Sequence, residues 1–302
     1  CAIQRGFGDS KSSMYFVMAA TATNVVLDYL LIAKFNMGVS GAALATIASQ
    51  ALSFVLSIVY FRSKKHIVTF NPKEFCFDKE IAKDIIRIGL PSALQQGTVN
   101  VAYLVLNGIV NSYGILASAA YGICVKLDSF AVLPCSAVND AVAAVTSQNL
   151  GAGQKERALQ GISAGRKMLI PFNIVLMAVM LLGGGYLVAI FNSDPQVIEM
   201  AHRYIKISCF MYVFYAIYYP LMGFIKGTGN AMFTLKNTIA AQLVIRVPIA
   251  YFFAKVLNFG FYGVAAAWII APIFSNTVYT IYLKSGKWYE RLKNNQKNGH
   301  SI

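Results

Sequence analysis

The sequence predicts an all-α membrane protein that crosses the bilayer several times. The chain is 57% apolar and only 13% charged, and its mean hydropathy is +0.57. A soluble domain carries about 25% charged residues. The charged residues of this chain also gather between long apolar stretches. These observations indicate a polytopic helical bundle rather than a soluble globular domain.

Eight apolar segments are long enough to span a bilayer core, which takes about 20 residues. They are predicted at 14–34, 41–61, 85–110, 116–145, 166–190, 196–225, 231–257 and 261–283. Prolines fall inside several of them, and such breakers are tolerated where neighbouring helices or a cavity satisfy the freed carbonyl groups. The chain has three isolated histidines and five scattered cysteines, so we expect no metal site and no cofactor.

The basic residues predict the orientation of these spans, because cytoplasmic loops carry an excess of Lys and Arg. Twenty basic residues lie on one side, in 1–13, 62–87, 148–167, 226–236 and 284–302, and four lie on the other. The C-terminus is therefore expected in the cytoplasm. The net charge of +14 is explained by this bias, so we expect no nucleic-acid partner.

A long internal repeat organises the chain. Gly6 and Gly8 match Gly227 and Gly229 at an offset of 221, and this offset also pairs Ala33-Lys34 with Ala254-Lys255. After a slip of one residue, the Gly38-to-Gly41 turn matches the Gly260-to-Gly263 turn. A repeat of this length predicts duplicated halves, which are common in secondary transporters. The first repeat lacks its beginning, which suggests a C-terminal piece of a longer protein.

Several motifs together resemble the multidrug and toxic compound extrusion (MATE) family of transporters. They are Arg5-Gly6-x-Gly8-Asp9, Asn24-x-x-x-Asp28-Tyr29, Gly38-x-x-Gly41-Ala42-Ala43-x-Ala45-Thr46, Gly89-Leu90-Pro91, Gln148-Asn149-Leu150-Gly151-Ala152-Gly153 and Lys226-Gly227-x-Gly229-Asn230. The resemblance implies a bundle of two six-helix lobes with the first lobe truncated. The chain would then hold the end of the N-terminal lobe (1–61), a cytoplasmic linker (62–84), a six-helix C-terminal lobe (85–283) and a basic tail (284–302).

Asp28 is the strongest candidate for a functional residue. A carboxylate in the middle of an apolar span is by default a functional hypothesis. Asn24 shares its helix face and Thr46 lies at a similar depth on the next span, so the three could bind Na⁺ or a proton. The alternative is a protonated Asp28 held by Asn24 as interhelical glue. The MATE resemblance also implies a cation site from Asn, Asp and Thr at these positions.

The internal repeat tests whether the fold itself needs these polar residues. In the second repeat, the residues expected at the positions of Asn24, Asp28 and Thr46 are Ile245, Ile249 and Trp268. The polar residues are not duplicated, so the fold itself does not need them.

Polar residues inside the later spans are candidates for a substrate cavity. Gln96, Asn100, Asn107 and Asn111 recur at intervals of 4, 7 and 4 along one helical face. This stripe could line a cavity or hydrogen-bond neighbouring helices. Lys126, Asp128 and Arg246 are charges at membrane depth. They could form a polar cavity wall, or Asp128 and Arg246 could be an interhelical ion pair.

The predicted function is a Na⁺- or H⁺-coupled antiporter that exports small organic, cationic or amphipathic compounds by alternating access. We expect a monomeric, multi-pass protein of the plasma membrane, whose partners are the lipid bilayer and a small-molecule substrate, and no enzymatic activity. The alternatives are a flippase for lipid-linked sugars with a large cationic cavity, and a membrane scaffold that transports nothing. Lys126 and Arg246 on one cavity surface would favour the flippase.

Overall fold

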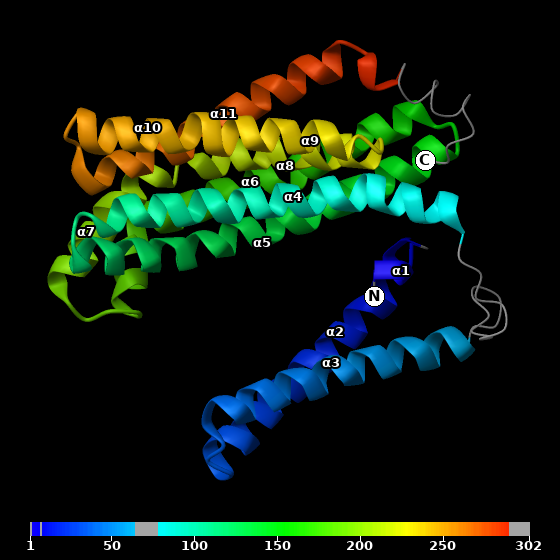
Figure 1. Cartoon of the computed structure of the whole chain (residues 1–302), viewed down its shortest axis with the longest axis horizontal. Coiled ribbons are helices and arrows are strands. Elements are labelled where there is room, and N and C mark those ends of the chain that lie inside the picture. The colour runs from blue at the N-terminus through cyan, green and yellow to red at the C-terminus, as the bar shows by residue number, and fades with distance from the viewer. Residues whose placement is uncertain (1, 7, 64–77, 290–302) are drawn as a thin grey trace. The chain divides into compact units, whose positions relative to one another are not determined.

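The computed structural model describes residues 2–6, 8–63 and 78–289, and within these ranges the chain forms helices and no strands (Figure 1). Two compact units divide at Asp78, the first Cys1–Asp78 and the second Lys79–Ile302. The helices of the first unit are α1 (Ala2–Gly6), α2 (Ser10–Asp28), the π-helical η1 (Tyr29–Lys34) and α3 (Gly38–Ser63). Those of the second are α4 (Lys79–Asn111), α5 (Ile115–Gly151), α6 (Lys155–Ala189), α7 (Pro195–Ser208), α8 (Met211–Gly227), α9 (Ala231–Ile239), η3 (Ala240–Arg246), α10 (Val247–Tyr251), η4 (Phe252–Val256), η5 (Gly260–Tyr262) and α11 (Gly263–Lys284).

Six of these helices, counted within the described ranges, are long and apolar enough to cross a membrane, and a seventh span results if the α7–α8 pair, bent by 51°, is one crossing. The eight predicted spans each coincide with a helix or a consecutive run of helices. Helix α4 is long enough but is not among the most apolar ones. Its polar stripe lowers its hydropathy, which is typical of a helix that faces a polar interior.

The linker predicted at 62–84 is shorter at both ends where the structure describes it. Helix α3 continues to Ser63 and helix α4 begins at Lys79, with Glu80 in its first turn. An acidic residue there is favourable, because the N-terminal end of the helix dipole is positive. The segment 64–77 and most of the predicted tail lie outside the described residues.

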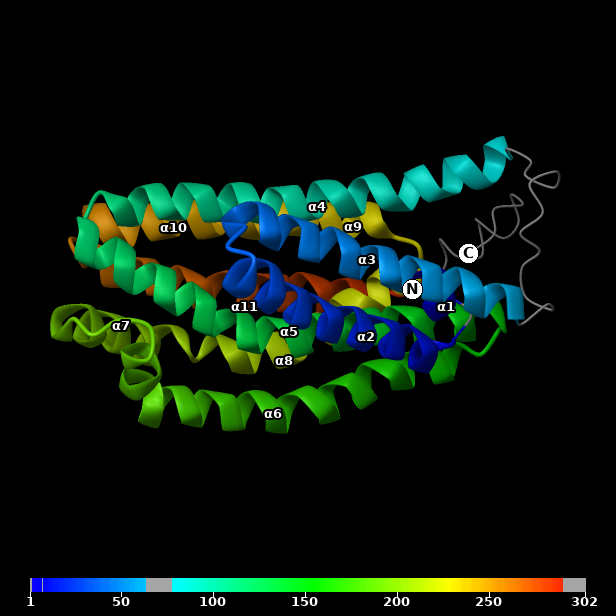
Figure 2. The same ribbon diagram turned by 90° about the horizontal axis from the view of Figure 1, so that it is seen from below.

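Helix α5 is the centre of the second unit. It packs on α6, α7 and α8, while α8 also packs on α6 and α11. Helices α4 and α6 lie on opposite sides of the unit, with α5 and α8 between them (Figure 2). The core joins small residues to large aromatic ones, including Tyr121, Tyr204 and Tyr212, each at most 1% exposed. Small residues let helix backbones approach closely where no hydrophobic effect drives helices together.

The backbone confirms the internal repeat at the start of each half. Asp9 caps α2 and Asn230 caps α9, and each side chain accepts a hydrogen bond from the backbone N–H three residues later, at 3.1 and 3.3 Å. Each capping residue is also bonded to a tyrosine of the next span. Tyr60 donates to the Asp9 carboxylate, and the Asn230 amide donates to the Tyr282 hydroxyl at 2.8 Å. Such caps satisfy amide groups that the helix leaves unpaired.

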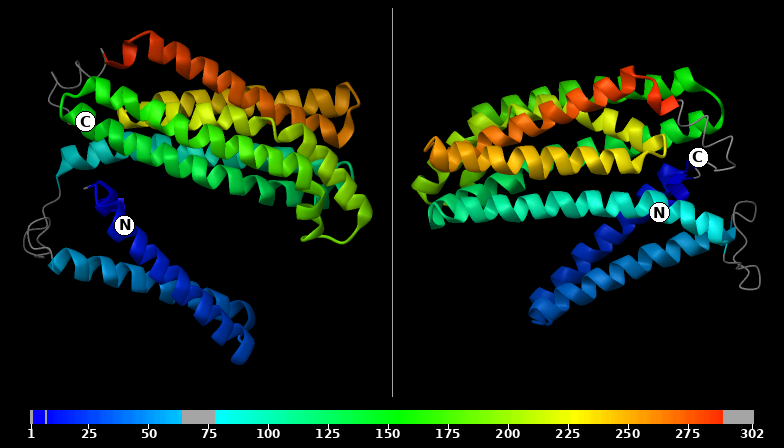
Figure 3. Two further views of the ribbon diagram at one scale, coloured as in Figure 1. Left: turned by 180° about the vertical axis from the view of Figure 1, so that it is seen from behind. Right: turned by 45° about the horizontal axis from the view of Figure 1, so that its top comes forward.

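The turns between the paired helices are also duplicated. Asn36 and Asn258 both have left-handed backbones, with φ of 51° and 55°, and each is followed two residues later by a left-handed glycine. The first turn joins η1 to α3, and the second joins η4 to η5 and α11 (Figure 3). At Gly263 the two segments touch, because a Cβ there would lie 2.6 Å from the backbone carbon of Phe253. Only glycine allows this approach.

The one-residue slip lies earlier than the sequence suggested. The caps Asp9 and Asn230 are 221 residues apart, but the left-handed Asn36 and Asn258 are 222 apart. The Phe35 N–H donates to the Leu30 carbonyl five residues earlier, as in a π-helix. The Leu257 N–H donates to the Phe252 carbonyl in the same way, and these two bonds are also 222 residues apart. The extra residue is therefore inserted between the cap and Phe252, and the π-helical η3 accommodates it. A π-turn is the helical form of a single-residue insertion.

The shifted register corrects the predicted pairings on this side of the slip. The Ala33-Lys34 match with Ala254-Lys255 is a coincidence of sequence, because the hydrogen bonds set the register one residue later. At the offset of 222 the counterparts of Asn24 and Asp28 are Arg246 and Ala250, not Ile245 and Ile249. Trp268 remains opposite Thr46.

Candidate functional site

The Asn24 and Asp28 side chains lie one helical turn apart, where α2 passes into η1. Asp28 Oδ1 and Asn24 Nδ2 are shielded from solvent, and neither has a hydrogen-bond partner among the described residues. A buried polar group without a partner costs about 1–3 kcal/mol. The hydrogen bond by which Asn24 would hold a protonated Asp28 is thus not formed through these two atoms. The Asp28 oxygen is free to accept a proton or a cation.

Thr46 lies on α3 and its hydroxyl is committed to its own helix. The hydroxyl donates to the Ala42 carbonyl at 2.9 Å, and the residue is exposed. It therefore donates no hydrogen bond to Asp28. A hydroxyl that donates its proton keeps its lone pairs, which can still bind a cation.

A cavity of about 440 Å³ lies within the second unit. Residues of α4, α5, α8, η3 and α11 line it. Gln96 and Asn100 of the predicted polar stripe are among them, and Asn107 is not. Gln95, beside the stripe, is 7% exposed and donates to the Thr238 hydroxyl at 3.0 Å. Within the stripe itself, Asn111 accepts a hydrogen bond from the Ser118 hydroxyl of α5 at 2.8 Å. Some stripe residues therefore line the cavity, and one bonds a neighbouring helix.

Arg246 is the most buried charge of this cavity. It is the last residue of η3 and is 3% exposed. Its Nη1 donates to Gln242 Oε1 at 2.8 Å, and the guanidinium carbon lies 3.2 Å from the ring centre of Trp268. The ring of Tyr103 is 5.5 Å away. Cation–π contacts of this kind stabilise a desolvated guanidinium by about 2 kcal/mol.

The expected ion pair of Asp128 with Arg246 is not formed. Asp128 is 3% exposed and accepts a hydrogen bond from the Tyr212 hydroxyl at 2.6 Å. The sequence indicated that Asp128 and Arg246 lie at membrane depth, but it contained no information on the rotation of their helices. Asp128 does not line the cavity, and neither does Lys126, which is exposed with its amine 5.9 Å from the ring of Phe191.

Several residues of the cavity were not predicted as a site. They are Tyr103, Asn139, Asp140, Tyr215, Tyr218, Tyr219, Lys226, Gln242 and Trp268. Tyrosines in an apolar span ordinarily pack or form an aromatic belt, so they did not stand out as cavity residues. Gln242 and Arg246 are four residues apart and therefore share a helix face, so this spacing could have predicted Gln242 as a neighbour of Arg246.

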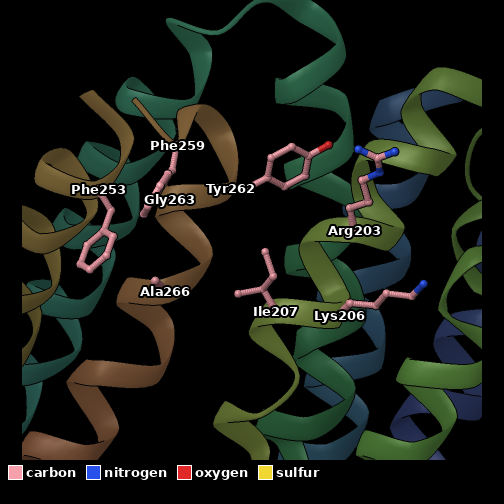
Figure 4. Close-up of a pocket in the computed structure, with 8 residues that line it drawn as sticks. All are labelled: Arg203, Lys206, Ile207, Phe253, Phe259, Tyr262, Gly263 and Ala266. Atoms are coloured by element: carbon pink, nitrogen blue, oxygen red, sulfur yellow. The ribbon is translucent and has the colours of Figure 1, made fainter. Parts of the chain in front are cut away.

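A second cavity, of about 580 Å³, lies between α7 and the η4–α11 turn (Figure 4). Its walls are mostly apolar, with Phe253 and Phe259 facing Arg203 and Lys206 across it. Arg203 pairs with Glu199 at 2.6 Å, and both basic residues are exposed. Long basic side chains near the end of a membrane helix ordinarily reach the interface in this way. This cavity therefore gives no sign of a bound group.

This chain is a polytopic helical membrane protein built like the secondary transporters. Three features place it in this class: the repeated helix pairs, the membrane-length spans and the polar cavity inside the bundle. The sequence profile described as MatE matches residues 91–252, more than half of the chain. The chain belongs to the MatE family.

Individual relatives agree with this. The chain is 29% identical over 286 residues to the probable multidrug resistance protein YpnP of Bacillus subtilis, covering 95% of this chain and 63% of the relative. It is also 29% identical over 297 residues to the probable multidrug resistance protein NorM of Thermotoga maritima, covering 96% of this chain and 63% of the relative. The chain thus spans less than two thirds of the length of these curated relatives.

The fold agrees as well. A MATE family transporter of the MOP superfamily, solved in an outward-facing conformation, superposes with a TM-score of 0.86 at 24% identity, covering 98% of this chain and 66% of that one.

Proposed function

We propose that the protein carrying this chain exports small organic compounds in exchange for Na⁺ or H⁺, with Asp28 as the coupling carboxylate. The observation that supports this most directly is the buried Oδ1 of Asp28, which has no hydrogen-bond partner among the described residues. A membrane-buried acid that is not used structurally is costly and is typical of ion and proton pathways. The relatives described as multidrug resistance proteins support the choice of an organic substrate.

Cation binding would act on the packing of α2, η1 and α3. An ionised carboxylate at membrane depth is strongly disfavoured, and a bound Na⁺ or proton removes that penalty. Asn24 and Thr46 would supply further oxygens if the bound ion is Na⁺. The π-helical η1 follows Asp28 directly. We propose that this segment changes conformation when Asp28 is neutralised, which is the step that alternating access requires.

The substrate would bind in the cavity of the second unit. Gln96, Asn100 and Arg246 are the predicted cavity residues that line it, and its tyrosines offer flat apolar surfaces. A pocket of several hundred Å³ with apolar walls and a few polar groups suits a small organic molecule. The flippase alternative needed Lys126 on the cavity as well, and Lys126 lies elsewhere. We therefore retain the exporter.

We further propose that the protein is a monomer of the plasma membrane with its C-terminus in the cytoplasm. The excess of basic residues on one side of the predicted spans supports this orientation. No cofactor is needed, since the coupling ion is itself transported.

Dye efflux from proteoliposomes tests the coupling role. The protein is compared with its Asp28→Asn variant under a Na⁺ gradient and, separately, under a proton gradient. Asp9→Asn is the matched control, because it makes the same change at the start of α2, where the repeat has Asn230. We expect Asp28→Asn to abolish gradient-driven efflux while the control retains it. The gradient that drives the wild type identifies the ion. Equal efflux from Asp28→Asn and wild type would make Asp28 a packing residue.

A further inference from the structure

Two nitrogens of the Arg246 guanidinium have no hydrogen-bond partner among the described residues. Arg246 lines the cavity of the second unit and is 3% exposed, and its Nε and Nη2 are buried with no hydrogen-bond partner among the described residues. The guanidinium forms no ion pair with a described carboxylate. Burying a cation without an anion is expensive, and removing its hydrogen-bond partners adds to that cost. The site is therefore incomplete as it stands.

The neighbouring acids do not supply the missing anion. Asp128 is bonded to the Tyr212 hydroxyl at 2.6 Å and lies off the cavity. Asp140 lines the cavity and accepts a hydrogen bond from the Asn139 amide at 3.0 Å, and Lys226 lines it as well. Among the described lining residues the cavity thus has two cations and one acid.

The geometry of the unpartnered nitrogens is specific. Trp268 covers one face of the guanidinium plane and Gln242 occupies Nη1. Nε and Nη2, the nitrogens left over, share one edge of the plane and point their N–H bonds the same way. This edge is the fork that binds a carboxylate through two parallel hydrogen bonds.

We infer that Arg246 binds the anionic group of an aromatic substrate, a carboxylate held at the Nε–Nη2 edge with its ring against the cavity tyrosines. Tyr215, Tyr218 and Tyr219 line the same cavity, and aromatic rings stack on such residues in offset or edge-on geometry. The inference rests on the proposed substrate cavity and narrows its ligand to aromatic anions, in place of the cationic compounds that the sequence suggested.

The inserted residue in η3 supports a dedicated role for Arg246. The first repeat has a regular helix at this level, so the fold does not need the π-turn. The π-turn ends at Arg246, and such turns are frequent at functional sites.

Tryptophan fluorescence tests the inference without transport. The chain has two tryptophans, so Trp288→Phe leaves Trp268, which touches Arg246, as the reporter. The purified protein in detergent is titrated with 4-nitrobenzoate, whose nitroaromatic ring quenches tryptophan, and with the neutral 4-nitrobenzamide as the matched ligand. We expect the carboxylate to bind about 10- to 100-fold more tightly, the ratio typical of charge-assisted hydrogen bonds.

Arg246→Gln should remove this preference for the carboxylate, and Arg246→Lys should retain part of it. Equal affinity of wild type for the two ligands would overturn the inference, as would a preference that survives in Arg246→Gln. The comparison of the two ligands on wild type needs no variant at Arg246, so it decides the question even if Arg246→Gln does not fold. No ion gradient is involved, so failure of the Asp28 coupling role would not affect this result.

Discussion

Gly223 allows a very close contact between α8 and α5, and replacing it should loosen the bundle. A Cβ at this position of α8 would lie 2.3 Å from the backbone oxygen of Asn139 on α5. Ordinary contact begins at 3.4 Å, so the helices would have to separate by about 1.1 Å. The obstacle is a backbone atom, which cannot turn away as a side chain can. Met222 and Asn139 line the cavity, so the contact also shapes it.

The expected cost follows from two opposing effects. Overpacking a tight site costs about 1–3 kcal/mol, and a clash with backbone belongs at the upper end. Alanine gains about 1 kcal/mol over glycine in a helix. Gly223→Ala should therefore lose about 2 kcal/mol of unfolding free energy. For a unit the size of Lys79–Ile302 that lowers the midpoint of thermal unfolding by about 4–8 °C.

Thermal unfolding in detergent, followed by far-ultraviolet circular dichroism, measures this loss. Gly122→Ala is the control, because Gly122 lies on α5 and a Cβ there would meet nothing within 4 Å. Its midpoint should stay unchanged or rise. Equal unfolding temperatures for Gly223→Ala and Gly122→Ala would contradict the close contact of α5 and α8.

Two further substitutions test the polar contacts of the second unit in the same unfolding assay. Asn230→Asp should keep the cap of α9, as the acid does in the first repeat, whereas Asn230→Ala should lose about 1 kcal/mol; equal midpoints for the two would contradict the capping role. Tyr212→Phe should cost about 1–3 kcal/mol, because it leaves the Asp128 carboxylate buried without its donor. Adding Asp128→Asn to that variant should recover part of the loss, and no recovery would mean that another group satisfies the acid.

Hydropathy was sufficient to predict the helices, because a span needs only length and apolar content. It could not predict the π-turn η3, which differs from an α-helix in hydrogen bonding and not in composition. The repeat was visible through Gly38 and Gly260, because these glycines have backbones that other residues rarely adopt. The exact position of the slip was not, since a chance match of Ala33-Lys34 with Ala254-Lys255 obscured it.

The candidate site was predicted only in part, for a reason of geometry. Periodicity identified Gln96 and Asn100, because residues spaced by four share a helix face. Whether two buried charges on different helices form an ion pair depends on how the helices are rotated and how far apart they lie. The residue pattern within one helix carries no information on either. Asp128 and Arg246 therefore looked like a pair and proved to have different partners. Trp268 is not a polar residue and so did not stand out in an apolar span, although its ring packs against the Arg246 guanidinium.

The extra residue of η3 also bears on how two copies of one ancestral segment came to differ. A point substitution changes one side chain, whereas one added residue taken up by a π-turn moves the residues on one side of that turn by one helical position. In the later copy this places Arg246 at the level where the earlier copy has Asn24. Asn24 lies one helical turn from Asp28. A single insertion can thus give duplicated segments opposite charge preferences while the caps and turns that hold each copy together stay as they were.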